Sequence, residues 1–348
     1  MQRLRRENQF VPQLPNQHQE MAKKQILYIV NPKSGIGKKS IIESDIRDNT
    51  DRMNIEYDII HTTHRGHAHE IATRNRNKID MVIAVGGDGT VNEVGSALLG
   101  SKTAMGIIPC GSGNGLARAL DIPLRTSTAI EVINDFNTKK IDVINIGGHT
   151  SLNVAGVGFD AYISHLFAKK RIRGPLQYMN LIATEYPKYK PQEWTLNIDG
   201  DIYNRTAFLI SFANSSQWGN NIHIAPNAQV DDGQMDVCIV SEFPHTAVPS
   251  LVISLLSQSI DSNKYDEMIR TRHLELSSSE PIVAHIDGEP ISLPNKIEIE
   301  LQPKALTVAA PSAEFFDSHR FNPAKVREQI INSVREPINE IKQALKEL

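Results

Sequence analysis

The sequence predicts an α/β plus β-rich fold: an N-terminal α/β domain with a parallel sheet, followed by an antiparallel β-sandwich-like domain. Up to about residue 139, short apolar runs alternate with segments of helical character. Beyond that point the apolar runs are short, and several are separated by Asp-Gly turns. Alternating strands and helices are typical of parallel sheets, whereas short strands joined by tight turns are typical of antiparallel ones.

In the first domain, strands are expected at 25–30, 55–61, 80–85 and 104–108. Helices are expected at 67–76, 91–99 and 116–120, with another after the first strand. This spacing places helices on both faces of a parallel sheet. Glycine-rich loops follow three of the strands. In an open α/β sheet such loops emerge at one edge and can converge on one ligand.

The second domain is expected to hold nine short strands and three helices. The strands are 142–146, 151–157, 194–198, 207–212, 235–240, 273–276, 282–286, 297–301 and 306–309, and the helices are 161–169, 176–186 and 247–259. A last helix, 323–348, carries an apolar stripe at spacings of three and four and is expected to pack on the first domain. The predicted divisions are a disordered extension (1–22), a first domain (23–145), a second domain (146–311) and a C-terminal segment (312–348).

Composition excludes several classes of function. The formal net charge of −3 exerts no general attraction for nucleic acid. No apolar run reaches the length of about 18 residues that a membrane span needs, so no transmembrane segment is expected. The first 20 residues lack the apolar core of a secretory signal, and the two cysteines are far apart. A cytoplasmic protein is therefore expected.

The strongest motif is Gly86-Gly87-Asp88-Gly89-Thr90, which lies between a predicted buried strand and a predicted helix. Such a loop places backbone N–H groups and a positive helix end at the sheet edge, where phosphates bind. A carboxylate inside the loop would repel phosphate unless a metal ion or a proton transfer involves it. Asp88 therefore indicates Mg²⁺-assisted phosphate chemistry.

Three further motifs lie at predicted loops or strand ends. Asn31-Pro32-Lys33-Ser34-Gly35 follows the first strand but lacks the spacing of a P-loop. Gly111-Ser112-Gly113-Asn114-Gly115 is no dinucleotide fingerprint, because Leu116 stands where that pattern needs glycine. In Asp287-Gly288-Glu289 the two carboxylates share a side if the strand continues, whereas an Asp-Gly hairpin turn would separate them.

These four motifs, with Asp231-Asp232-Gly233-Gln234-Met235-Asp236 before the last, occur in the order seen in the diacylglycerol kinase catalytic family, which the chain resembles over about 25–311. The resemblance implies that the first domain binds ATP and the β-rich domain holds a lipid. It places the reaction in the cleft between the two domains.

The resemblance also assigns roles to individual residues. Glu289 would accept the proton of the lipid hydroxyl, with Asp88 as a further catalytic carboxylate, and Asp287 would help to hold Mg²⁺ or orient the site. The carboxylate of Asp232 and main-chain carbonyls near Gln229 and Gln234 would hold a structural Mg²⁺. The expected nucleotide contacts are Asn31, Pro32, Lys33, Ser34, Gly35, Thr62, Gly86, Gly87, Asp88, Gly89, Thr90, Val91, Asn92, Ser112 and Asn114.

The expected activity is ATP- and Mg²⁺-dependent phosphorylation of a lipid hydroxyl on a diacylglycerol- or sphingosine-like acceptor. Two alternatives stay open: an NAD kinase-like enzyme with a soluble acceptor, and a non-catalytic lipid or nucleotide sensor on the same fold. The basic run 169–174 beside apolar residues either meets anionic headgroups during transient membrane association or is a solvated face. No motif determines the oligomeric state, and a homodimer stays open.

Overall fold

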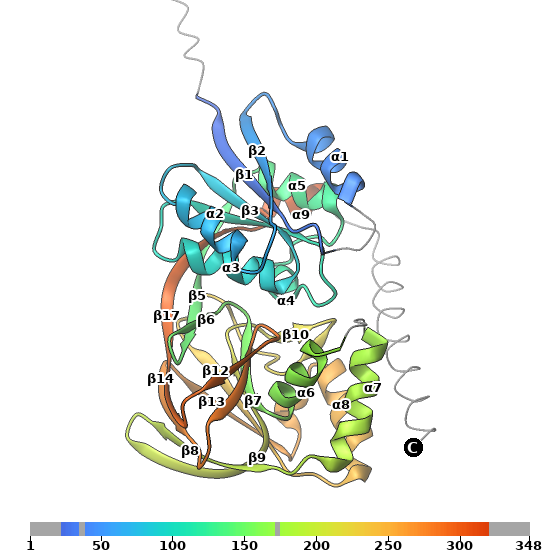
Figure 1. The fold of residues 1–348 in the computed structure, drawn as a ribbon, viewed down its shortest axis with the longest axis vertical. Helices are drawn as coiled ribbons and strands as arrows, with labels where there is room; N and C mark the ends of the chain where they lie inside the picture. The colour runs from blue at the N-terminus through green and yellow to red at the C-terminus, as the bar shows by residue number, and fades with distance from the viewer. Residues whose placement is uncertain (1–21, 35–38, 171–174, 320–348) are drawn as a thin grey trace, which may run out of the picture.

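The computed structural model describes residues 22–34, 39–170 and 175–319. Its first domain contains four parallel strands, β1 (Lys24–Val30), β2 (Ile55–His61), β3 (Met81–Gly86) and β4 (Ala104–Pro109), in the order β4-β3-β1-β2 (Figure 1). Every residue of β3 and β4 is buried, as expected for central strands of a parallel sheet.

The strand order reverses between β1 and β3, and this reversal places helices on both faces. The chain moves outward from β1 to β2 through α1 (Lys39–Asn49). It then returns through α2 (His67–Asn75) and α3 (Asp88–Leu98) to β3 and β4. Because parallel crossovers are right-handed, the two directions put α1 opposite α2 and α3. The loops after β1 and β3 therefore flank the switch point, where ligands bind in open α/β sheets.

Helix α5 (Thr126–Asn134) packs against α1 and was not expected from the sequence. Its apolar residues Ala129, Ile130, Val132 and Ile133 are all buried. Short α4 (Gly115–Ala119) follows the third glycine-rich loop, near the predicted position.

The second domain is antiparallel and β-rich, as predicted. Its strands are β5 (Thr138–Ile146), β6 (His149–Ser151), β7 (Val154–Gly158), β8 (Gln192–Ile198), β9 (Asp201–Ala213), β12 (Met235–Ser241), β13 (Asp266–Thr271), β14 (His273–Ser277), β15 (Ile282–Ile286), β16 (Glu289–Leu293) and β17 (Lys296–Ala309), and a separate pair is formed by β10 (Gln217–Gly219) and β11 (Ile222–His223). Neither β13 nor β16 was predicted, because both are short and only partly buried.

Strand β17 joins the two domains into one sheet. The sequence predicted two strands here, but a single 14-residue strand continues through a register shift between Gln302 and Leu306. It pairs antiparallel with β5 and β14, and it meets β4 in parallel at Val308 and Met105. The long strand rises along one side of the molecule in Figure 1.

Three helices lie together on one side of the second domain: α6 (Phe159–Ala168), α7 (Pro175–Glu185) and α8 (Val248–Leu256) (Figure 1). Single 3₁₀ turns occur at η1 (Tyr186–Lys188), η2 (His245–Ala247) and η3 (Ile260–Ser262). A cluster of buried apolar residues, among them Phe159, Leu209 and Ile224, packs in this region apart from the core within the β-sheets.

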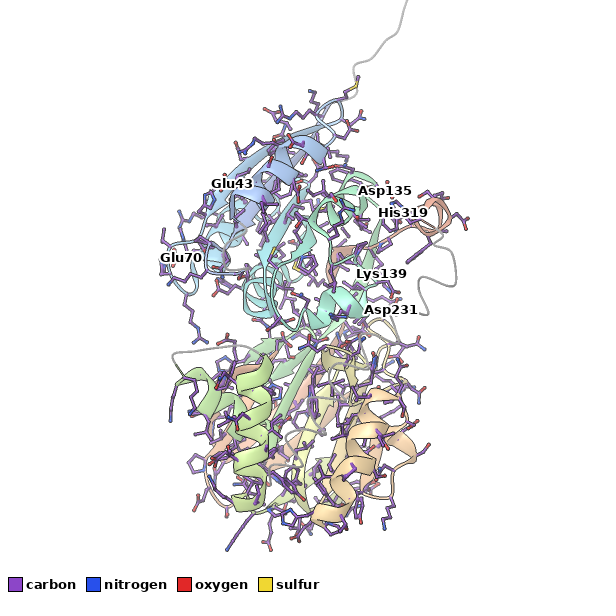
Figure 2. All side chains as sticks on the ribbon, turned by 90° about the vertical axis from the view of Figure 1, so that its right-hand side faces the viewer. Glu43, Glu70, Asp135, Lys139, Asp231 and His319 are labelled. Carbon is purple, nitrogen blue, oxygen red and sulfur yellow. The ribbon has the colours of Figure 1, made fainter. Side chains whose placement is uncertain are left out.

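The C-terminal helix α9 (Ala313–Ser318) lies against α5 of the first domain. Ser312 caps α9 and donates to Asp135, while His319 pairs with Glu131 at 2.8 Å. Figure 2 labels His319 and Asp135 at this contact between α9 and α5. The predicted helix 323–348 and residues 1–21 of the predicted N-terminal extension lie outside the described residues.

Candidate active site

The glycine-rich loops of the first domain contact one another at the switch point. The Asn31 amide donates to Thr90 Oγ1 at 2.9 Å, which joins the loop after β1 to the start of α3. A methyl group placed on Gly111 would lie only 2.6 Å from the Gly87 Cα. The close approach of the second and third loops therefore requires glycine at position 111.

Asp88 connects the second loop to the third. Its carboxylate accepts the backbone N–H of Gly115 at 2.7 Å and that of Asn114 at 3.0 Å. Burial raises the pKa of Asp88 and the nearby Asp287 charge adds to the rise, while the two N–H groups oppose it. Each oxygen accepts one of these two donors, and the Asp88 carboxylate also lines the cavity described below.

The predicted nucleotide residues divide into those that line the central cavity and those that support it. The cavity is lined by Asn31, Lys33, Ser34, Thr62, Gly87, Asp88, Gly89, Thr90, Asn92 and Ser112. Gly86, Val91 and Asn114 are buried and do not line it, Pro32 is exposed outside it, and Gly35 is outside the described residues. Asn114 is in the left-handed region (φ 51°), and both of its amide atoms bond the Gly111 backbone.

Asp287 and Gly288 form a tight turn between β15 and β16, both with positive φ (49° and 84°). The Asp287 carboxylate nevertheless accepts five hydrogen bonds. The donors are Ser151 Oγ, Asn92 Nδ2 and the backbone N–H groups of Leu152, Asn153 and Val154, at 2.7 to 3.2 Å. A carboxylate has about four acceptor positions, so this one is saturated. Of the two expected roles, the geometry favours orienting the site over holding Mg²⁺.

Glu289 begins β16 and extends toward the first domain. One carboxylate oxygen pairs with Arg65 at 3.2 Å. A methyl group placed on Gly89 would lie 3.4 Å from the other oxygen. The Glu289 carboxylate of the second domain therefore lies against the glycine-rich loop that follows β3 in the first domain.

Arg65 and Glu93 are site residues that the sequence analysis did not include. Arg65 is on the loop before α2, which also carries Gly66 at φ 85°. The Glu93 carboxylate, from α3, accepts the N–H groups of Gly66 at 2.8 Å and Ala68 at 3.1 Å. Glu93 thus caps α2 from a neighbouring helix and holds the loop that presents Arg65 to Glu289.

A single cavity of about 2020 Å³ extends from the glycine loops into the apolar side of the second domain. Its apolar lining comes mainly from α6, α7, β9 and α8 and from the segments beside them. It includes Phe159, Ile163, Phe167, Tyr178, Ile182, Tyr186, Phe208, Leu209, Ile224, Val240, Phe243, Val248, Leu251, Val252, Leu255, Leu256 and Ile260. Asp88 and Glu289 both line this cavity. The cavity thus combines glycine-rich loops, two carboxylates and a large apolar lining.

The loop before β12, Asp231-Asp232-Gly233, is held by cations and by Asp142. Lys139 pairs with Asp231 at 2.9 Å at the junction of the two domains (Figure 2). Asp142 accepts the Gly233 N–H at 2.6 Å. Arg272 donates to the Gly233 carbonyl at 2.7 Å, so the loop is tied down on several sides.

The Asp232 carboxylate already has a cationic partner. One oxygen accepts the Gln234 N–H at 3.1 Å, and the other contacts the Arg270 guanidinium. No group of three or more His, Cys, Asp or Glu side chains within the described ranges is placed to hold a metal ion. The Mg²⁺ site at Gln229, Asp232 and Gln234 stays a prediction, and its carboxylate is already paired with the Arg270 guanidinium.

Comparisons with known proteins establish the class of this chain. Residues 25–146 match the family model of the diacylglycerol kinase catalytic domain, and 153–310 match that of the YegS C-terminal NAD kinase beta sandwich-like domain. A probable lipid kinase YegS-like from Chromohalobacter salexigens is 32% identical over 70% of this chain and 79% of that protein. A diacylglycerol kinase from Staphylococcus haemolyticus is 28% identical over 75% and 81%. The chain belongs to this family of diacylglycerol and YegS-like lipid kinases, and it is a kinase.

Solved structures confirm the fold. A putative diacylglycerol kinase from Bacillus anthracis superposes with a TM-score of 0.67 at 23% identity, over 86% of this chain and 98% of that one. Yeast NADH kinase complexed with NADH gives a TM-score of 0.50 at 10% identity, over 87% and 89%. Within the part of the chain that the structure describes, no helix has the length and apolar character that a membrane crossing demands.

Proposed function

We propose that this kinase transfers the γ-phosphate of ATP to the hydroxyl of a diacylglycerol- or sphingosine-like lipid. The observation that carries the proposal is the shape of the cavity. Glycine-rich loops and apolar side chains line the same cavity, and the Glu289 carboxylate, which also lines it, lies against Gly89 of the second loop. A nucleotide and a lipid that met in such a space would place γ-phosphate and hydroxyl together near a carboxylate.

The glycine loops suit the nucleotide. The N-terminus of α3 and the backbone N–H groups around Gly87 and Gly89 would bind phosphate oxygens. Asp88 would hold the Mg²⁺ that accompanies ATP, and that ion would neutralise charge on the transferring phosphoryl group. The saturated Asp287 would position the turn without binding metal.

The Glu289 carboxylate fits the role of base toward the acceptor hydroxyl. Phosphoryl transfer places the acceptor oxygen in line with the γ-phosphate, with a base in hydrogen-bond reach. Glu289 is the one of the three predicted catalytic carboxylates that is half-exposed and free of backbone donors among the described contacts. It would take the proton of the lipid hydroxyl as the bond to phosphorus forms.

The lipid would be taken from a membrane surface by transient association. Lys169 and Lys170, at the end of α6, are exposed close to the helices that line the apolar pocket. Cations at such a position would attract anionic headgroups. The rest of the predicted basic run, residues 171–174, lies outside the described residues.

The direct test is a kinase assay with γ-labelled ATP, Mg²⁺ and micelles of diacylglycerol, monoacylglycerol, sphingosine, ceramide or phosphatidylglycerol, with NAD as a soluble acceptor. We expect label in a lipid, and Glu289→Gln to reduce transfer by about two orders of magnitude or more while ATP still binds. Glu70→Gln, at an exposed glutamate of α2, is the matched control.

Each other result has a definite meaning. Label in NAD alone would replace the lipid with a soluble acceptor. Wild-type turnover in Glu289→Gln would reject Glu289 as the base. ATP binding without transfer to any acceptor would favour a sensor on a kinase fold.

A further inference from the structure

A buried histidine–carboxylate pair lies behind the turn that carries Glu289. His285, on β15, is 4% exposed, and Asp160, in the first turn of α6, is 8% exposed. His285 Nε2 lies 3.0 Å from Asp160 Oδ2. Neither residue belongs to the four motifs, and the transfer chemistry proposed above does not use them.

The hydrogen bonds determine where the imidazole carries its proton. The Gly288 backbone N–H donates to His285 Nδ1 at 3.3 Å. A backbone N–H can only donate, so Nδ1 must be the unprotonated nitrogen. Neutral imidazole then has its proton on Nε2, which donates to Asp160. The carboxylate thereby selects the tautomer that can accept from the turn.

Asp160 is itself held as an acceptor. Its other oxygen accepts the Ala161 N–H at 2.7 Å, and Ser211 Oγ lies 3.4 Å from the oxygen that faces His285. The backbone also makes room for the pair. A methyl group placed on Gly156 would lie 2.3 Å from Asp160 Oδ2 and 2.9 Å from His285 Nε2. Glycine at position 156 therefore permits the contact.

We infer that His285 and Asp160 are positioning residues that orient the turn carrying Glu289, an inference that rests on the proposed role of Glu289. Asp287 anchors the first turn residue to α3 and to β6–β7, while His285 holds the second, Gly288, by its N–H. Both residues of the turn are thus held by hydrogen bonds, and Glu289 is the next residue in the chain. The Asp160–His285–Gly288 chain sets the direction in which Glu289 leaves the turn.

The experiment compares His285→Ala in the wild-type and Glu289→Gln backgrounds, with kcat and KM measured for ATP and for the accepted lipid. In the wild-type background we expect kcat to fall by about 10- to 100-fold with both KM values unchanged, the scale for displacing a reacting group by about an ångström. In the Glu289→Gln background we expect no further fall, because the positioned group is gone.

Two further variants test the contributions of His285 and Asp160 separately. His285→Asn keeps an acceptor near the place of Nδ1, so it should recover most of the kcat that His285→Ala loses. Asp160→Asn keeps the side-chain volume and one acceptor oxygen, so a smaller loss of kcat is expected. Both stay informative if His285→Ala does not fold. His273→Ala, at an exposed histidine of β14, is the matched control.

Equal loss in the two backgrounds would overturn the inference in favour of a general structural role. A raised lipid KM with unchanged kcat would overturn it in favour of direct lipid contact, since both side chains line the cavity. Full activity in His285→Ala, with Glu289→Gln inactive, would reject positioning and leave the proposed function intact. Wild-type turnover in Glu289→Gln would reject the base and this inference together.

Discussion

At the scale of single residues, the Asp287-Gly288 turn is both a hairpin turn and a part of the site. The sequence left these readings as alternatives, and the structure joins them. Positive φ at both positions forms the turn, and the turn directs the Asp287 carboxylate toward five hydrogen-bond donors. One of these donors, Asn92, belongs to the first domain, so the turn also holds the two domains together.

Asp287→Ala is expected to destabilise the chain by about 3 kcal/mol, because several partly buried donors lose a charged acceptor. Urea unfolding at neutral pH measures this change. Asp199→Ala is the matched control, because Asp199-Gly200 is a similar turn (φ 53° and 97°) with an exposed aspartate. The left-handed alanine costs about the same in both. Equal destabilisation would show that the five hydrogen bonds contribute little.

Asp266, on β13, predicts a pH dependence of stability. Neither of its oxygens has a hydrogen-bond partner among the described residues, and burial raises its pKa to about 7, with Asp261 and Glu267 adding to the rise. Between about pH 4 and pH 7 the folded state therefore binds a proton that the unfolded state has lost. Folding stability therefore falls as the pH rises from about 4 to about 7, and this loss is complete above the folded-state pKa.

Asp266→Asn removes that titration. From pH 5 to pH 8 the variant should gain about 2 kcal/mol relative to the parent, allowing for solvent at this edge strand. Urea unfolding of both proteins at the two pH values measures the difference, in which other titrating groups cancel. A difference that does not change with pH would show that Asp266 is ionised throughout.

At the scale of elements, α2 begins without a capping side chain of its own. Gly66 precedes it in the left-handed region, and Glu93 from α3 supplies the missing acceptors. A search of the sequence for capping residues near the start of a helix cannot find a cap that comes from the next helix. The only indication in the sequence was a glutamate in the first helical turn after the glycine-rich loop.

Glu93→Ala should destabilise the chain by about 1 to 2 kcal/mol, the usual effect of losing a helix cap. Thermal unfolding checks this. Glu70→Ala removes an exposed glutamate of α2 that pairs with Arg74, and should cost less than about 0.5 kcal/mol (Figure 2). Equal losses for the two variants would count against the cap.

The elements that the sequence predicted well are those with a strong apolar pattern. Strands β1, β3 and β4 lie within a residue of the predicted ranges, because continuous burial leaves a clear signal, and α3 begins three residues earlier than predicted. Helix α5 was missed, as were β13 and β16, whose residues are only partly buried. The break predicted in β17 is a register shift at Gln302-Pro303-Lys304, a sequence that is typical of a turn.

At the scale of the whole molecule, the cavity depends on both domains. Its polar end belongs to loops of the first, and its apolar end to helices that pack on the second. The sequence placed apolar residues in α8 but did not distinguish cavity lining from core packing. In the structure Val252 lines the cavity, whereas its neighbour Ile253 is 59% exposed and does not.

Val252→Trp should therefore fill the apolar end of the cavity and raise the KM for the accepted lipid by about tenfold or more, because bulk in a binding pocket excludes the ligand. ATP affinity should not change, since the glycine loops are untouched. Ile253→Trp is the matched control. Steady-state kinetics and nucleotide titration measure both effects. The same lipid KM in both variants would exclude this end of the cavity as the acceptor pocket.

The sequence by itself determined the fold class, the kinase family and the loops that converge at the sheet edge, because these depend on local patterns and on motifs in order. Tertiary structure alone decided what each polar group does. Asp287 is saturated by residues 133 to 195 positions away, Asp232 is neutralised by Arg270, and His285 meets Asp160 across 125 positions. Hydrogen-bond partners so distant in the chain cannot be inferred from the spacing of residues, and only the tertiary packing of the strands, helices and loops brings them together.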